Sequence, residues 1–390
     1  MKTANALKGN NMKVVVAIDS FKGSLTSLQA GNAVKDAILR LNSDIDVLVK
    51  PLADGGEGTV SALSSGYNSE IINISVCGPT CRPVCASYCI LKDTNTAVIE
   101  MASAAGITLI SDSERNPLNT TTYGVGEIIK DAINRGVRRF IVGIGGSATN
   151  DGGVGMLNAL GFEFLDSNGK QIESGAKGLR SLASINTNNV IPELRESEFR
   201  IACDVTNPLC GENGCSSVFG PQKGATPEMV TELDAWLANY AEIAKTVSKT
   251  ADENYPGVGA AGGLGFAFMA FTNAKLESGI SIILEETKLE EYIKDADIVV
   301  VGEGRLDEQT VMGKAPIGVA RLAKKYGKRV IGFSGCVTEN AEACNEHGID
   351  AFFPILRTVV TLEEALNPEI AYKNMTATAY QVFRLLIGEK

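Results

Sequence analysis

Short β-branched runs alternate with stretches of helical spacing at both ends of the chain. Residues 14–18 form the first run, and after a short loop Thr26 and Gln29 match a capping box ahead of apolar positions that share one helix face. The alternation returns near the C-terminus, where helical patterns separate three apolar runs at residues 298–301, 329–333 and 351–353. Strands that alternate with helices predict a parallel sheet joined by right-handed crossovers.

The middle of the chain follows a different pattern. Residues 71–99 contain alternating, β-rich runs with turn dipeptides and no helical period, which predicts antiparallel strands. Helical spacing returns at residues 120–135, and Gly136 is placed to end that helix. Because the two chain ends resemble each other more than either resembles the middle, we predict that they build one domain around an inserted one.

We therefore predict an α/β protein of two domains. Residues 12–66 and 286–390 form a discontinuous parallel-sheet domain, and residues 67–285 form the inserted α/β domain with a mixed sheet. Residues 1–11 are polar and aperiodic, so we treat them as an extension outside the fold. A length of 390 residues supports this division, because single cores rarely grow past roughly 250 to 300 residues.

The charge balance narrows the classes of partner. A formal net charge of -10 argues against a general affinity for nucleic acid or for an anionic membrane, since both require a positive field. The sequence shows neither a run of about 18 apolar residues nor a signal peptide, and we expect a cytoplasmic protein. The partner we expect is a small-molecule substrate, and the sequence leaves a homo-oligomer open.

Cysteine and histidine usage limits the chemistry further. Nine cysteines in a chain without a secretory signal indicate reduced thiols. Cys77, Cys81, Cys85 and Cys89 are spaced by four residues, which leaves a metal cluster or inward-facing small side chains as alternatives. The second is favoured, because the spacing matches no zinc or iron–sulfur site. His347 is the only histidine, and its isolation argues strongly against a Ser/His/Asp hydrolase.

Loops rich in glycine and polar residues follow many of the predicted strands. The densest comes after residues 140–142, where glycines allow close backbone approach to a ligand and Ser, Thr, Asn and Asp supply hydrogen bonds. Ligands bind at the carboxyl ends of strands in open parallel sheets, which gives eight candidate loops at residues 19–24, 54–59, 143–153, 204–211, 220–225, 259–265, 302–310 and 334–335. Their many backbone donors, several carboxylates and few cations suit phosphoryl transfer with Mg²⁺.

The common nucleotide signatures do not occur in this sequence. Gly313 and Lys314 are followed by alanine and lack the spaced glycine of a P-loop. A GxGxxG pattern occurs at Gly257, Gly259 and Gly262, but it follows a proline and a polar stretch instead of a strand. The pattern is therefore weak evidence for dinucleotide binding.

Several longer motifs occur in a fixed order along the chain. They read DSFKGSL (19–25), ADGGEGT (53–59), EMASAAG (100–106), GIGGSATNDGG (143–153), CDVTNPLCG (203–211), GPQKGA (220–225), GAAGGLG (259–265), GEGRLDEQT (302–310) and GKAP (313–316). In these motifs residues 12–390 resemble the bacterial glycerate kinase type 1 family. The resemblance implies ATP-dependent, Mg²⁺-dependent phosphorylation of D-glycerate, usually at the 2-hydroxyl, to 2-phosphoglycerate and ADP. It also implies a flavodoxin-like domain from both chain ends with a second α/β domain inserted.

Roles of single residues are assigned from their chemistry. Lys22 is the first candidate for the cation that meets the substrate carboxylate or the transferring phosphate, and Asp54 and Asp204 are candidates for the catalytic base. Either aspartate could instead cap a turn. The remaining predictions are Ser20, Lys22, Asn207 and Arg305 for substrate; Gly145, Gly146, Ser147, Thr149, Lys223 and Lys314 for ATP; and Asp151, Glu303 and Asp307 for Mg²⁺.

Three alternatives stay open. The product could be 3-phosphoglycerate, which the residues alone do not decide. An NAD-dependent hydroxy-acid dehydrogenase would share the α/β architecture and the small anionic substrate, but it predicts a strand-led GxGxxG. A non-catalytic protein that binds a small acid would leave the acidic loops without a purpose.

Overall fold

The computed structural model describes residues 12–387 except residues 54, 57 and 309. By their internal contacts these residues form two compact units. The first, the terminal unit, contains residues 12–53, 61–67 and 280–387, and the second, the inserted unit, contains residues 55–60 and 68–279. The predicted extension, residues 1–11, lies outside the described residues.

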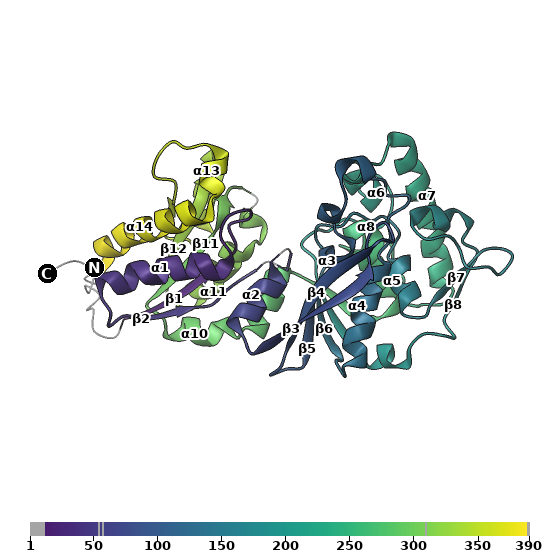
Figure 1. Cartoon of the computed structure of the whole chain (residues 1–390), viewed down its shortest axis with the longest axis horizontal. Coiled ribbons are helices and arrows are strands. Elements are labelled where there is room, and N and C mark those ends of the chain that lie inside the picture. The colour runs from purple at the N-terminus through teal and green to yellow at the C-terminus, as the bar shows by residue number, and fades with distance from the viewer. Residues whose placement is uncertain (1–11, 54, 57, 309, 388–390) are drawn as a thin grey trace. The chain divides into compact units, whose positions relative to one another are not determined.

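A five-stranded parallel sheet organises the terminal unit (Figure 1). Its order is β13-β12-β11-β1-β2, which becomes 2-1-3-4-5 when the strands are counted along this unit alone, the flavodoxin-like order. The predicted fold class is thus confirmed for this sheet. The strands are β1 (Lys13–Ile18), β2 (Asp46–Val49), β11 (Ile298–Leu306), β12 (Arg329–Val337) and β13 (Ala351–Pro354).

Helices cover both faces of this sheet. Helices α1 (Ser27–Leu41) and α14 (Pro368–Ile387) lie side by side over one face, where Val14, Val16 and Ile18 pack against their apolar sides (Figure 1). The predicted capping box is present, because Gln29 N–H donates to the Thr26 hydroxyl and the Thr26 N–H donates to the Gln29 side chain. The other helices are α10 (Leu289–Asp295), α11 (Ala315–Lys325), α12 (Ala343–Glu346) and α13 (Leu362–Leu366).

A six-stranded mixed sheet of order β10-β9-β6-β5-β4-β3 organises the inserted unit. Strands β5, β6, β9 and β10 are parallel, whereas β3 and β4 form the antiparallel hairpin predicted from residues 71–99. The bounds are β3 (Ser69–Cys77), β4 (Pro83–Leu91), β5 (Thr96–Glu100), β6 (Arg139–Gly143), β9 (Glu198–Ala202) and β10 (Asn273–Glu277), with a separate pair β7 (Glu163–Leu165) and β8 (Ser184–Asn186).

Aromatic side chains fill the core of the inserted unit. Phe140 on β6 and Phe199 on β9 stack with ring centroids 4.6 Å apart, and Phe268 of α8 packs against Phe199 at 5.6 Å. Helix α8 is buried on nearly all sides, which explains its continuous apolar sequence. The helices are α3 (Ala102–Ala105), α4 (Tyr123–Asn134), α5 (Val154–Ala159), α6 (Cys215–Phe219), α7 (Pro227–Lys245) and α8 (Ala260–Phe271). Helices α2 (Thr59–Gly66) and α9 (Gly279–Glu286) occupy the chain segments where it passes from one unit to the other.

Within the described residues, no helix has both the length and the apolar content that a membrane crossing requires. All nine cysteines are free thiols. Cys89 is buried, but Cys81 and Cys85 are exposed, so the favoured interpretation of four inward-facing side chains is wrong for these two. Their position in and beside a hairpin turn leaves them on the surface.

Cys81 occupies the left-handed region of backbone space, with φ of 60°. A side chain is unfavourable there and glycine is not, so Cys81→Gly is expected to raise the free energy of unfolding by about 0.5 to 1 kcal/mol. Urea unfolding measures the change. Cys85→Gly is the control, because this exposed thiol lies in regular strand β4, where glycine should lower stability. A stability loss in both variants would contradict the strain at Cys81.

Candidate functional site

Three predicted loops meet at the carboxyl edge of the parallel sheet in the terminal unit. The Asp19 N–H, just after β1, donates to the Gly302 carbonyl on β11 at 2.9 Å. Glu303 is in register with Ser334 on β12, and both are buried. The predicted segments 19–24, 302–310 and 334–335 therefore lie together, as the topology predicts. Residues 302–306, however, continue strand β11, and residues 334–335 lie within β12, so both strands run further than the apolar pattern predicted.

The loop after β1 presents Lys22 to solvent. Phe21 and Leu25 are buried and hydrogen-bonded to each other through their backbones, and Gly23 between them has φ of 78°. The absence of a side chain at Gly304 lets this loop approach, since a Cβ there would lie 3.5 Å from the Lys22 nitrogen. Ser20 is half-buried beside it.

Carboxylates and cations form one cluster at the carboxyl end of β11, from Glu303 and Arg305 on the strand and from Asp307 and Lys314 after it. Lys314, the residue before α11, places its Nζ 3.7 Å from Glu303 Oε2 and 3.8 Å from Asp307 Oδ1. Arg305 lies against the other oxygen of Asp307 at 3.3 Å, and the Thr310 hydroxyl donates to Glu303 Oε1 at 2.6 Å. The structure thus brings together two predicted Mg²⁺ ligands, one predicted phosphate cation and one predicted substrate residue.

The two carboxylates of this cluster are oxygen donors of the type that Mg²⁺ prefers. Glu303 is only 8% exposed, so the protein already positions one of them firmly. In the part of the chain that the structure describes, no group of three or more acidic, cysteine or histidine side chains forms a metal site. An ion held by Glu303 and Asp307 would therefore need water or substrate oxygens for its remaining ligands.

The glycine-rich segment 55–60 lies across the carboxyl ends of strands in the inserted unit. A Cβ on Gly143, the last residue of β6, would lie 2.0 Å from the Gly55 carbonyl, and a Cβ on Gly55 would lie 2.4 Å from that of Ala202, which ends β9. The Glu100 carboxylate, at the end of β5, accepts the Val60 N–H at 2.7 Å. By these contacts the segment groups with the inserted unit, although we predicted it in the terminal domain. Asp54 lies outside the described residues.

The loop from residue 144 to 153 is exposed only at its start. Gly145 and Gly146 face solvent, whereas Ser147 is 8% exposed and Thr149 is fully buried. The Gly146 carbonyl accepts the Ile107 N–H at 2.9 Å. Of the residues predicted for ATP in this loop, the two glycines are the ones exposed to solvent.

Asp151 ties the first turns of two helices together. Its carboxylate accepts the Thr122 N–H and hydroxyl at 2.8 and 2.9 Å, ahead of α4, and the N–H groups of Gly153 and Gly155 at 3.2 Å, at the start of α5. Burial raises the pKa of the Asp151 carboxyl, and these hydrogen bonds act in the opposite direction. A Mg²⁺ ion at Asp151 would have to compete with these four hydrogen-bond donors. The sequence does contain a signal for this structural role, because an aspartate just before a helix commonly accepts hydrogen bonds from the N–H groups of its first turn.

Lys223 lies inside the inserted unit and not at its surface. It is 2% exposed, and its Nζ donates to the Thr149 carbonyl at 2.6 Å. The Thr149 hydroxyl and the Asn150 side-chain oxygen are also buried, and among the described residues neither has a hydrogen-bond partner. In this position Lys223 holds the loop 144–153 from the buried side, through its hydrogen bond to Thr149. Lys223 could contact ATP only if this loop moved away.

Burial lowers the pKa of Lys223 from 10.5 to about 8. Between these two values the unfolded chain binds more protons than the folded one, so this group makes stability rise as the pH increases from about 8 to 10.5. We expect the free energy of unfolding of the wild type, relative to that of Lys223→Met, to increase between about pH 8 and pH 10.5. Urea unfolding at several pH values measures this difference. A difference that does not change with pH would contradict a buried, titrating Lys223.

Asp204 and Asn207 lie in the loop after β9. Asp204 is exposed and accepts the Gly279 N–H at 3.2 Å, so its carboxylate is held at the carboxyl edge of the sheet. Asn207 donates to the Asn213 carbonyl at 2.9 Å, and its own carbonyl accepts the Gly259 N–H at 3.0 Å. Asp204 is thus accessible to solvent, whereas the half-buried Asn207 holds its loop together.

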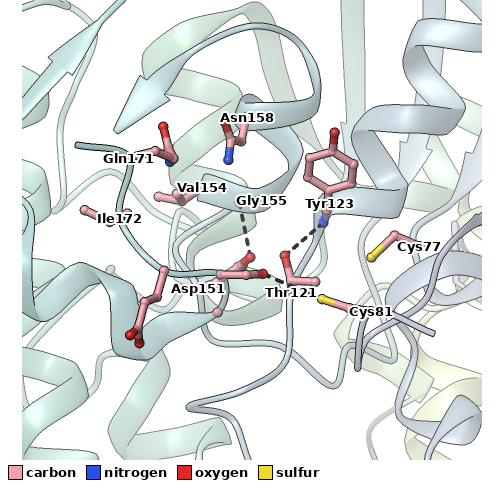
Figure 2. A pocket seen from close by; sticks show the side chains of 13 residues that line it. Cys77, Cys81, Thr121, Tyr123, Asp151, Val154, Gly155, Asn158, Gln171 and Ile172 are labelled. Carbon is pink, nitrogen blue, oxygen red and sulfur yellow. Dashed lines mark hydrogen bonds between the residues drawn. The ribbon is translucent and has the colours of Figure 1, made fainter. Parts of the chain in front are cut away.

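A cavity of about 300 Å³ opens beside Asp151 within the inserted unit (Figure 2). The hairpin turn after β3, the starts of α4 and α5 and the segment 171–175 build it. Of the predicted site residues only Asp151 lines it. The sequence gives no local sign of this cavity, because four segments far apart in the chain contribute its walls.

An α/β protein with a flavodoxin-like sheet, acidic and cationic strand-end loops and a mixed second sheet has the features of a phosphotransferase. The comparisons with known proteins agree. The family model described as glycerate kinase family matches residues 14–387. The chain is 47% identical to a glycerate kinase of Haemophilus influenzae, over 96% of this chain and 99% of the relative. It is 46% identical to the glycerate 2-kinase of Escherichia coli, over 93% and 95%.

A solved structure leads to the same assignment. A crystal structure of a glycerate kinase 2 candidate from Salmonella typhimurium LT2 superimposes with a TM-score of 0.89 at 45% identity, covering 97% of this chain and 98% of that one. The chain therefore belongs to the glycerate kinase family, and it is a kinase.

Proposed function

We propose that this enzyme transfers the γ-phosphoryl group of ATP to the 2-hydroxyl of D-glycerate, giving 2-phosphoglycerate and ADP. The observation that carries the proposal is the cluster of Glu303, Asp307 and Lys314 beside the exposed Lys22 loop, at the carboxyl edge of a parallel sheet. Phosphoryl transfer requires oxygen ligands for Mg²⁺ and cations for phosphate, and this edge supplies both. The name of the Escherichia coli relative supports the 2-hydroxyl as the acceptor.

The proposed roles follow from charge and exposure. Lys22 is an exposed cation that meets the glycerate carboxylate or the transferring phosphate, with Ser20 and Arg305 as further substrate contacts. Asp204, exposed on the inserted unit, accepts the hydroxyl proton, and an ionised aspartate can do so when the transition state is loose. Gly145 and Gly146 donate backbone N–H groups to the phosphates of ATP.

Glu303 and Asp307 are the residues that would hold Mg²⁺. When bound, the ion would neutralise charge on the phosphate oxygens. Lys314, which contacts both carboxylates, is placed to pair with phosphate oxygens once an ion takes its partners. We expect excess EDTA to abolish turnover and Mg²⁺ to restore it. Full activity after exhaustive chelation would remove the metal from the proposal.

A coupled assay of ADP release with purified protein, ATP, Mg²⁺ and D-glycerate tests the activity. Phosphorus NMR of the product separates 2-phosphoglycerate from 3-phosphoglycerate. ADP release that does not depend on glycerate would overturn the proposed reaction.

A further inference from the structure

We propose that the cavity beside Asp151 binds the nucleoside end, adenine and ribose, of ATP. The inference rests on the proposed function for the identity of the nucleotide, but the cavity itself is defined by the inserted unit alone. Its volume of about 300 Å³ is at the lower limit of ligand pockets, which suits one part of a nucleotide better than the whole molecule.

The charge of the lining excludes the anionic ends of the reactants. Its ionisable groups are Asp151, Glu173, Tyr123 and two thiols, and no lysine or arginine is among the lining residues. Lys177 and Arg180 approach Glu173 only at 4.0 and 3.9 Å, from outside the cavity. Neither glycerate nor a triphosphate chain would bind stably beside two carboxylates without a cation, because the like charges repel each other. An uncharged ligand group is required.

The hydrogen-bonding groups of the lining suit a purine and its ribose. Asn158 and Gln171 carry amides, each of which can donate and accept, as the edge of adenine does. Gln171 uses its oxygen to accept the Phe164 N–H at 3.1 Å, which leaves its amide hydrogens for a ligand. Ser174 adds a hydroxyl at the rim.

Apolar and aromatic groups complete the walls. Val154 and Ile172 lie on the side of Asn158 and Gln171, and Tyr123 stands at the start of α4 (Figure 2). A planar base buries apolar faces and pairs its polar edge, which is the combination that these residues offer. Among the reactants of the proposed reaction, the nucleoside is the only large uncharged group.

Chain connectivity agrees with this placement. The loop that contributes Asp151 to the cavity also carries Gly145 and Gly146, the exposed backbone donors proposed for the phosphates. One loop would then contact both ends of the nucleotide. Glycerate would have no part in the cavity.

Steady-state kinetics of Asn158→Ala and Gln171→Ala test the proposal. We expect KM for ATP to rise about five- to tenfold in each, as the loss of one hydrogen bond implies, while kcat and KM for glycerate stay within twofold. The preference for ATP over GTP should fall as well. Gln381→Ala is the matched control, because this exposed amide on α14 lies outside the cavity and outside the candidate loops. An unchanged KM for ATP in both variants would overturn the assignment.

The exposed thiol of Cys81 gives a readout that does not need turnover. N-ethylmaleimide labelling, followed site by site by tandem mass spectrometry, should slow at Cys81 when adenosine is present and continue at Cys85, which does not line the cavity. Inorganic tripolyphosphate should leave Cys81 unprotected. Protection by tripolyphosphate alone would assign the cavity to phosphate and overturn the proposal. Protection by adenosine in a protein that does not phosphorylate glycerate would keep the nucleoside site and reject the proposed reaction.

Discussion

Lys22→Ala is expected to lower kcat for glycerate phosphorylation by about 10²- to 10³-fold, the loss typical of one electrostatic contact to the transition state. The side chain is exposed, and the loop is anchored by buried Phe21 and Leu25, so the substitution should leave the fold intact. The measurement is kcat from the ADP-coupled assay, together with circular dichroism and thermal unfolding of the variant.

Lys13→Ala provides the control for this loss. Lys13 is also exposed, but it lies at the amino end of β1, whereas Lys22 lies in the loop that follows the carboxyl end of that strand. Its replacement should change kcat by less than about twofold, because surface charges distant from the reaction contribute little. A Lys22→Ala enzyme with near-normal turnover would remove Lys22 from the site.

Gly143→Ala is expected to lower the free energy of unfolding by about 2 to 3 kcal/mol, the cost of forcing an extra methyl group into a packed contact. The new Cβ would lie 2.0 Å from the Gly55 carbonyl. Little room surrounds Gly55 for a shift, since a Cβ on Gly55 would itself lie 2.4 Å from the Ala202 Cβ and 2.9 Å from the Gly279 Cα. Urea unfolding gives the stability, and KM for ATP reports whether the displaced loop still binds nucleotide.

Gly145→Ala is the matched control for the stability loss. It lies two residues further along the chain, in the loop after β6, where a Cβ would meet its nearest neighbour at an ordinary 3.9 Å. We expect little change in unfolding free energy at this position. Equal destabilisation at both positions would mean that the loop tolerates no side chain anywhere, and that the contact with Gly55 is not the cause.

The local pattern of apolar and polar residues predicted most of the fold. The apolar runs became β1, β11, β12 and β13. The first three are buried on both faces along most of their length, which is why they are apolar almost without interruption, whereas the edge strand β13 is only half-buried. The hairpin of β3 and β4 followed from alternation. The grouping of residues 55–60 with the inserted unit could not be predicted, since it depends on the fit of Gly55 against Ala202, almost 150 positions away in the sequence.

The candidate site was predicted less completely. Glycine-rich loops were expected at strand ends, and the sheets place them there. Composition, however, does not distinguish an exposed polar residue from a buried one, and Asp151 and Lys223 are both buried and engaged within the protein. The cavity could not be predicted from the sequence either, because its walls come from separate segments of the chain.

The central position of β1 has a consequence for synthesis of the protein. Its partner β11 begins 280 residues after the end of β1, at Ile298, so the terminal sheet cannot close until most of the chain has left the ribosome. At typical rates of translation that interval is roughly 15 to 60 seconds. The inserted unit completes its own strand pairing earlier, because its last strand, β10, ends at Glu277. During this interval the edge of β1 that β11 will cover remains unpaired, and unpaired strand edges of this kind make a nascent chain prone to aggregation.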